Sequence, residues 1–96
     1  MGNPFAAQTE LVIMRMLRDE PGGMYGLALV KASDGRLKRG TIYVTLGRLE
    51  EKGYVRSRVK ADADHPGIPR PIYKLTALGE RVLSGAELAG WQLSGA

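Results

Sequence analysis

The chain has 96 residues, with 14 Lys or Arg against 10 Asp or Glu, no cysteine and a formal net charge of +4. This length holds one domain with one core, and the lack of cysteine excludes disulfides and thiolate metal sites. No run approaches the 18 apolar residues of a membrane span, and the first residues lack the basic start of a signal peptide. We therefore expect a cytoplasmic protein with no membrane partner.

The positive charge is concentrated in the middle of the chain. Residues 36–74 hold ten Lys or Arg against four Asp or Glu, a net charge of +6, whereas residues 1–35 and 75–96 each carry −1. A basic block in one segment is typical of a protein that binds a polyanion. A basic surface that is merely solvated gives the same composition, so charge alone leaves both interpretations open.

Two helices are predicted in the first third of the chain. A first helix is expected over residues 4–18, because Asn3 is a favourable N-cap and proline follows it at the first helical position. After a turn at residues 20–23, a short second helix is expected over residues 25–32. The sequence Ser-Asp-Gly at residues 33–35 ends it.

The third predicted helix, Gly40–Lys52, carries the strongest signal. On a helical wheel Ile42, Leu46 and Leu49 form a single apolar stripe, and Gly53 is placed to end the helix. The side opposite this stripe, with the basic residues that precede the helix, is predicted to contact DNA. The predicted contacts are Lys38, Arg39, Gly40, Thr41, Tyr43, Val44, Thr45 and Arg48.

These residue types suit DNA for separate reasons. Gly40 and Gly47 lack side chains, so the backbone can approach a sugar-phosphate chain, and the threonine hydroxyls can donate to phosphates. Arg48 could pair with guanine O6 and N7, and Val44 could meet a thymine methyl group. The alternative is an ordinary surface helix in which Arg48 pairs with a neighbouring glutamate.

A basic hairpin is predicted directly after the third helix. The alternating run over residues 54–60 places three apolar or small side chains on one face and Arg56, Arg58 and Lys60 on the other. A loop over residues 61–70 leads to a second strand over residues 72–75. Lys60 and Arg70 are predicted phosphate or minor-groove contacts. His65 in the loop is either a pH-sensitive contact or a solvated side chain.

A last helix is predicted from Ala77, with Thr76 as its N-cap. Leu78, Val82, Ala86, Ala89 and Leu93 share one face and are expected to pack on the domain. Leu83, Leu88 and Trp91 lie off that stripe and are predicted to contact a partner. Trp91 is read either as part of an effector pocket or as an apolar anchor between two tails.

Three segments resemble the PadR-type winged-helix transcriptional regulators: MYGL at Met24–Leu27, GTIYVTLGRLEEKGYV at Gly40–Val55, and RPIYKLTALG at Arg70–Gly79. The family usually has proline after the tyrosine of the second segment, where this chain has Val44. The resemblance implies a bacterial homodimeric repressor whose groove-facing helix and wing correspond to the third helix and the hairpin. It also implies a short form, in which paired C-terminal helices with tryptophans can hold a flat aromatic effector.

The sequence therefore predicts a mainly α fold with a small β-wing: a winged helix-turn-helix with a three-helix core, a two-stranded antiparallel wing and a C-terminal helix. Residues 1–76 would form the DNA-binding domain and residues 77–96 a dimerisation segment. The predicted function is a sequence-specific DNA-binding regulator, a homodimeric repressor that reads a pseudo-palindromic operator in double-stranded DNA. The alternatives are a protein-interaction module and an antirepressor that binds another regulator. No catalytic or metal-ligand spacing predicts an enzyme or a cofactor.

Overall fold

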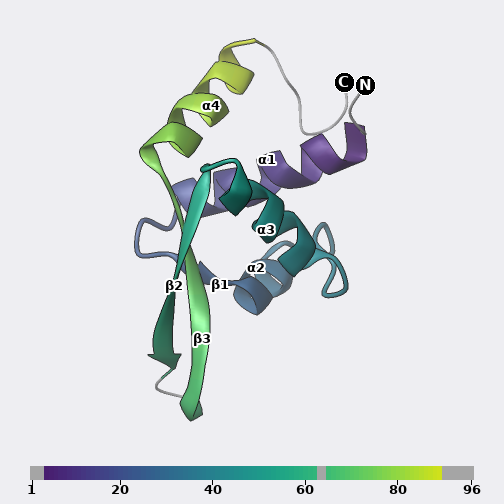
Figure 1. Cartoon of the computed structure of the whole chain (residues 1–96). Helices are drawn as coiled ribbons and strands as arrows, with labels where there is room; N and C mark the ends of the chain where they lie inside the picture. The colour runs from purple at the N-terminus through teal and green to yellow at the C-terminus, as the bar shows by residue number, and fades with distance from the viewer. Residues whose placement is uncertain (1–3, 63–64, 90–96) are drawn as a thin grey trace.

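The computed structural model describes residues 4–62 and 65–89, and these form four helices and one three-stranded antiparallel sheet (Figure 1). In chain order the elements are α1 (Pro4–Arg18), β1 (Met24–Tyr25), α2 (Gly26–Ala32), α3 (Ile42–Glu51), β2 (Val55–Asp62), β3 (His65–Leu75) and α4 (Ala77–Leu88). The helices lie on one side of the sheet, and β2 and β3 extend beyond them as a hairpin. This arrangement confirms the predicted winged helix-turn-helix.

The helix bounds follow the sequence closely, but α3 begins at Ile42, two residues later than predicted, and the predicted loop over residues 61–70 is largely strand, because β3 begins at His65. α1 spans the predicted residues, although its expected N-cap, Asn3, lies outside the described residues. α2 begins at Gly26, one residue later than expected, because Tyr25 is part of β1. Tyr25 pairs with Ile72 and Met24 with Tyr73, so the wing is the longer part of a sheet with a third, two-residue strand.

The sheet has the order β1-β3-β2, and β2 pairs with β3 in an antiparallel register. Val55 is the partner of Leu75, and Ser57 is the partner of Tyr73. Val55 and Tyr73 are buried, so this face packs on the helices. The opposite face carries Arg56 with its partner Lys74, as the alternation of the first strand predicts.

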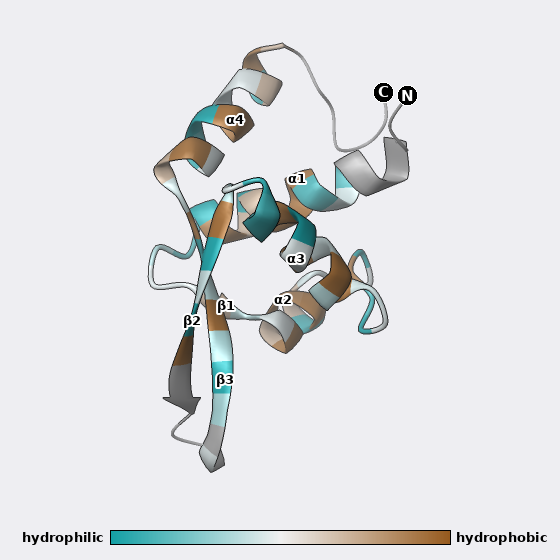
Figure 2. Ribbon diagram, in the orientation of Figure 1, coloured by the Kyte–Doolittle hydropathy of each residue, from teal (hydrophilic) through white to brown (hydrophobic). Residues whose placement is uncertain are grey.

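The core lies between α1, α3, the start of the hairpin and α4. Its most completely buried side chains are Ile13, Met14, Leu17, Leu29, Ile42, Leu46, Leu49, Leu83 and Val55. The predicted stripe of α3 is fully inside, because Ile42 is 1% exposed and Leu46 and Leu49 are 0% exposed. Figure 2 shows bands of hydrophobic and hydrophilic residues along α4, as expected for a helix with one packed side.

A glycine and a threonine join α3, the hairpin and α4. Gly53 has φ +79°, and the amides of Gly53 and Tyr54 donate to the carbonyls of Glu50 and Leu49 at 3.0 and 2.9 Å. This is the Schellman end that the sequence predicts. The Thr76 hydroxyl donates to the Gly53 carbonyl at 2.6 Å and accepts from the Gly79 amide at 3.0 Å. Thr76 therefore caps α4, as expected, and ties that cap to the end of α3.

Val82 and Ala86 of the predicted stripe of α4 pack against the core, but the most buried residue of the helix lies off that stripe. Leu83 is 0% exposed and belongs to the core, whereas Leu78, expected to pack inward, is 42% exposed. The reason is Gly79, which lies so close to the Tyr54 carbonyl that a Cβ at this position would overlap it. This close approach fixes the rotation of α4 and turns Leu83 inward.

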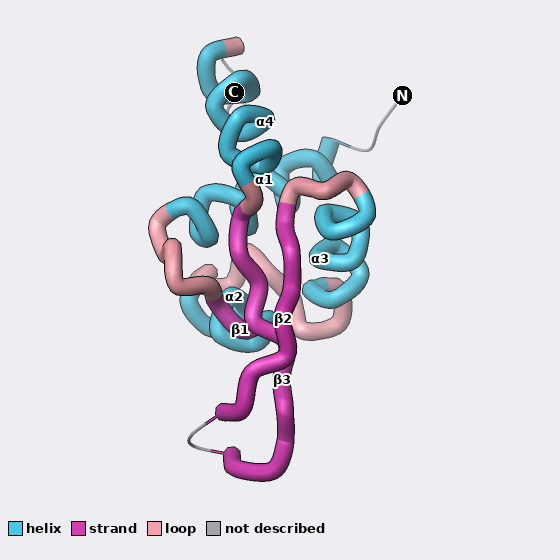
Figure 3. The backbone as a smooth tube through the Cα atoms, turned by 60° about the vertical axis from the view of Figure 1, so that its left-hand side comes forward, coloured by secondary structure: helices cyan, strands magenta, loops and turns pink. Residues whose placement is uncertain are grey.

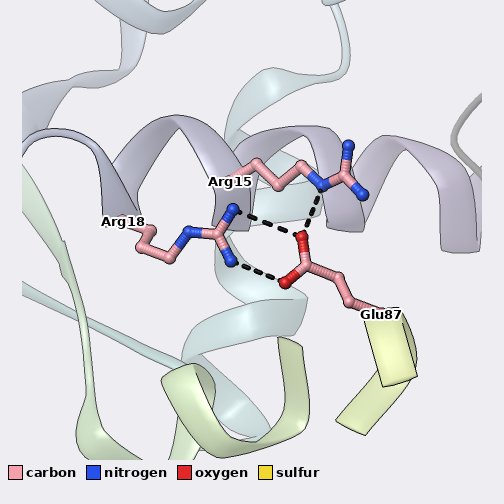
Figure 4. Close-up of polar contacts among 3 residues, drawn as sticks. All are labelled: Arg15, Arg18 and Glu87. Carbon is pink, nitrogen blue, oxygen red and sulfur yellow. Dashed lines mark hydrogen bonds and ion pairs between the residues drawn. The ribbon is translucent and has the colours of Figure 1, made fainter. Parts of the chain in front are cut away.

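Two arginines of α1 also hold α4. Glu87 accepts from Arg18 Nη1 at 2.7 Å and from Nη2 at 3.2 Å, and its carboxylate lies 3.1 Å from Arg15 Nε (Figure 4). The hydrogen bond from Arg18 is the main reason why the pKa of Glu87 lies below its usual value.

None of the helices among the described residues is both long and apolar enough to span a membrane.

Candidate nucleic-acid interface

The connection between α2 and α3 is built around one buried hydroxyl. Ser33 Oγ donates to the Val30 carbonyl at 2.7 Å and accepts from the Leu37 amide at 3.0 Å. Ser33 is 6% exposed, and both of these hydrogen bonds satisfy it inside the protein. Leu37 is consequently held in the core, and the exposed residues Lys38 and Arg39 follow at the start of α3.

The side of α3 opposite its core stripe is exposed in the single chain. Tyr43 is 47% exposed and Val44 is 58% exposed, and Arg48 is also exposed. Within the described residues Arg48 is in no ion pair, so the alternative in which a neighbouring glutamate holds its guanidinium is not what the structure has. The three side chains that could read base edges are therefore uncovered by their own domain.

The two glycines near this side are not required by packing. A Cβ added at Gly40 or at Gly47 would meet no atom within 4 Å. Glycine costs about 1 kcal/mol relative to alanine inside a helix, so Gly47 weakens α3 without relieving a contact in the protein. Because Gly47 has no side chain, another molecule can approach the backbone in the middle of α3.

Tyr43 is set in place by a third glycine. A Cβ on Gly26 would lie 2.6 Å from Tyr43 Cε1, so the ring rests directly on the first residue of α2. This contact leaves the ring half exposed along the boundary between α2 and α3. It also explains why glycine follows tyrosine in the segment Met24–Leu27.

Thr45 does not belong with the exposed set. It is 8% exposed, and its hydroxyl donates to the Thr41 carbonyl at 3.1 Å. This hydrogen bond within the helix occupies the only proton that Thr45 could offer a phosphate. The expectation that Thr45 contacts DNA is therefore wrong for this arrangement, whereas Thr41 is exposed.

Glu50 links α3 to the hairpin, a contact that the sequence reasoning missed. One oxygen of its carboxylate accepts from the Ser57 hydroxyl at 2.7 Å and from the Ser57 amide at 3.2 Å. Burial raises the pKa of the Tyr73 hydroxyl, and the nearby Glu50 carboxylate raises it further. Glu50 is exposed, and its carboxylate links the wing to α3 through Ser57.

The predicted wing residues are brought together as far as the structure describes them. Lys60 and Arg70 are Cα partners in the β2–β3 ladder. The side chains of Lys60 and His65 and all of Trp91 lie outside what the structure describes. Arg70 is partly buried. The pairing places both predicted contacts at one level of the hairpin.

The predicted dimer residues separate into two groups. Leu83 is a core residue of its own domain, so it cannot contact a partner. Leu88 is 89% exposed at the end of α4. A groove of 450 Å³ lies between α1, α4 and Tyr54, and its apolar lining includes Leu11, Met14 and Val82. Among the described residues no group of three or more potential ligands could hold a metal.

A helix-turn-helix formed by α2 and α3, followed by a basic hairpin, defines the winged-helix class of DNA-binding transcription regulators. A model of the "Transcriptional regulator PadR-like family" matches residues 13–85. The match covers most of the chain, which therefore belongs to the PadR-like family. Members of this family are transcription regulators rather than enzymes. Among curated proteins, none matches the chain.

Solved structures agree with this assignment. A PadR-like transcription factor from Bacteroides fragilis is 27% identical, with 93% of this chain and 85% of that chain covered and a TM-score of 0.75. A PadR family regulator from Clostridium difficile is 27% identical, with 84% of each chain covered and a TM-score of 0.71. A transcriptional regulator from Thermoplasma acidophilum is 25% identical, with 88% of this chain and 81% of that chain covered and a TM-score of 0.75.

Proposed function

We propose that this chain is a homodimeric repressor that binds a pseudo-palindromic operator through α3 and the wing. The observation that carries the proposal is the uncovered side of α3, where Tyr43, Val44 and Arg48 are exposed around an open Gly47. Repression follows because a protein bound at a promoter excludes the polymerase.

Each part of the interface has a separate role in this proposal. Arg48 pairs with guanine O6 and N7, and Val44 contacts a thymine methyl group. Lys38, Arg39 and Thr41 bind phosphates beside the groove and fix the register of α3. Arg70 and Lys60 contact the backbone or the minor groove from the wing.

Two copies are needed to read two half-sites. Recognition helices about 34 Å apart enter successive major grooves on one side of the duplex. In this proposal the end of α4 makes the dimer contact, because Leu88 is 89% exposed there and is available to pack on a second copy. A small aromatic effector stays a prediction, and the groove between α1 and α4 is large enough to hold one.

Selection of bound duplexes from a random pool, followed by mobility shifts on the selected site, tests the proposal. The selected site should be an inverted repeat, and log K should fall with log salt at a slope of about −7 if each protomer neutralises about four phosphates. Arg48→Ala should lose about 1–3 kcal/mol of binding free energy and relax one operator position. The matched control is Arg81→Ala, which removes an exposed arginine from α4.

A protein-interaction module or an antirepressor would shift no duplex at low or moderate salt. Equal affinity and equal sequence preference for the wild type and Arg48→Ala would remove α3 as the reading element. Light scattering tests the dimer separately, because a monomer that binds the operator tightly would contradict the two-site arrangement.

A further inference from the structure

The outer face of the sheet, formed by Arg56, Arg58, Lys74 and Ile72, has no place in the function described so far. Alternation along β2 places Arg56 and Arg58 on the side away from Ser57, which faces α3. Their Cα partners on β3 are Lys74 and Ile72. Figure 3 shows β2 and β3 in front of the helices, with this side of the sheet toward the viewer.

This outer face is cationic and uncompensated. Arg56 and Arg58 are exposed and Lys74 is partly exposed, and within the described residues none of the three is in an ion pair. Three of the described carboxylates bind other groups: Glu50 binds Ser57, Glu87 binds Arg15 and Arg18 of α1, and Glu10 binds Lys52. Three cations that repel one another on one small surface are held there without a counter-charge from the described part of the fold.

The outer face is also hollowed. A pocket of 250 Å³ is lined by Arg56, Ser57, Arg58, Ile72 and Lys74. Ile72 is 8% exposed and forms an apolar floor between the cations. The arginine and lysine stems can cover such a floor while their charged ends stay at the surface.

The spacing of the cations fits a linear polyanion. Side chains on one face of a strand repeat at about 6.7 Å, and double-stranded DNA carries one charge per about 1.7 Å of helix axis, so several phosphates lie along the length of the row. Beyond the Cα pair of Val59 and Pro71, the ladder continues with Lys60 and Arg70, the wing residues that are proposed to contact DNA. A small anion would meet one or two of these groups, whereas a phosphodiester chain can meet the whole row.

We propose that this outer face binds phosphates of the DNA that flanks the operator. The proposal rests on the proposed function, since α3 must first place the duplex beside the wing. Because the outer face and α3 lie on opposite sides of the hairpin, the flanking DNA curves around the wing to reach it. Phosphate contacts carry no base sequence, so they add affinity and length dependence, whereas the bend itself favours flanking sequences that deform easily.

The test compares two lengths of operator duplex: the selected site alone, and the same site with about one helical turn added at each end. Wild-type protein should bind the longer duplex more tightly and with a steeper salt dependence. In the double variant Arg56→Ala/Arg58→Ala the salt exponent on the longer duplex should fall by about 1.8 per protomer, since each lost phosphate contact removes about 0.9. Affinity for the short duplex should be unchanged.

Single variants supply the matched control. Arg58→Ala should lose about half of the effect of the double variant, and Arg81→Ala, which removes an exposed arginine from α4, should lose none of it. Circular dichroism and thermal unfolding of each variant establish that the fold is retained, which the exposure of these side chains leads us to expect.

Three results would overturn the inference. Identical salt exponents for the double variant and Arg81→Ala on the longer duplex would show that the outer face does not touch DNA. Equal loss on both lengths would place the contact inside the operator. If the wild type captured a second, separately labelled duplex and the double variant did not, the outer face would bind another DNA molecule instead of the flanking DNA. Failure of the wild type to bind any duplex would instead remove the proposed function itself.

Discussion

α3 and α4 pack on the same core, but their outer sides differ in chemistry. Tyr43, Val44 and Arg48 lie on the outer side of α3 around an open glycine, whereas α4 exposes Leu78 and, almost completely, Leu88, together with the charged Glu80 and Arg81. A helix that reads base edges needs polar side chains that can bond to the bases, and small residues where its backbone lies close to the duplex. A helix that joins two proteins needs apolar area, which water does not tolerate in a large patch. We therefore propose different partners for the two outer sides, DNA for α3 and a second copy of the chain for α4.

The glycines of the two helices show the same contrast. Gly79 is required by the fold, because a side chain would overlap the Tyr54 carbonyl. Gly47 and Gly85 both face open space, so neither is required by a neighbour. Four experiments test this contrast between α3 and α4.

The largest expected effect is that of Leu88→Lys on self-association. Burying a leucine is worth about 1.5–3 kcal/mol, so loss of Leu88 from both sides of a symmetric contact should raise the dimer dissociation constant at least a hundredfold. Sedimentation equilibrium measures it. Ser84→Lys, at another exposed position of α4, is the control. Equal dissociation constants for the two variants would mean that the end of α4 is not at the interface.

The next effect separates Gly79 from Gly85. Gly79→Ala should lower the free energy of unfolding by about 1–3 kcal/mol, because the added methyl group forces α4 away from Tyr54. Gly85→Ala should raise it by up to about 1 kcal/mol, since it only improves helix propensity. Urea unfolding at fixed protein concentration gives both values. A Gly79→Ala variant as stable as the wild type would contradict the close approach.

Gly47→Ala should change stability and DNA binding in opposite directions. The free energy of unfolding should rise by up to about 1 kcal/mol, because nothing in the protein opposes the methyl group. Operator affinity should fall about tenfold, which is about 1.4 kcal/mol, if the α3 backbone approaches the duplex here. Gly85→Ala should leave operator affinity unchanged. Unchanged affinity of Gly47→Ala would place the duplex farther from α3.

The smallest effect concerns Glu87, which holds α4 on α1. Its pKa is lowered by the Arg18 hydrogen bond, so the ion pairs stabilise the fold above the ordinary pKa of 4.5, and this contribution is lost as pH falls through the lower folded value. Glu87→Gln should therefore melt at a slightly lower temperature than the wild type at neutral pH, and the two should converge in acid. A difference that persists in acid would point to packing instead of charge.

Much of the fold could be predicted because its signals are local. The apolar stripe of α3, the glycine that ends it and the N-cap at Thr76 depend on neighbours within one or two turns, and each is confirmed. β1 was missed because two residues show no alternation. Leu83 was misplaced because α4 is apolar on more than one side, and the close approach at Gly79 that decides its rotation is a tertiary contact.

The candidate site was predicted less completely, because part of it depends on contacts that the sequence pattern does not report. Wheel geometry gives the side of α3 that faces outward, and this determines the exposure of Val44 and Arg48. It does not give the hydrogen bond that occupies the Thr45 hydroxyl. The Glu50 contact joins a helix to a strand across a turn, so no periodicity reports it.

The packing of the Tyr43 ring on Gly26 has a consequence for how the operator preference of this regulator can change. Residue 26 is buried under the ring, and any larger residue there would push the aromatic ring outward, toward the side of α3 that is proposed to contact DNA. Altered operator preference can therefore arise from a substitution beneath the reading surface. The choice of residue at position 26 therefore limits the DNA specificity of this chain, as the residues at the contact itself do.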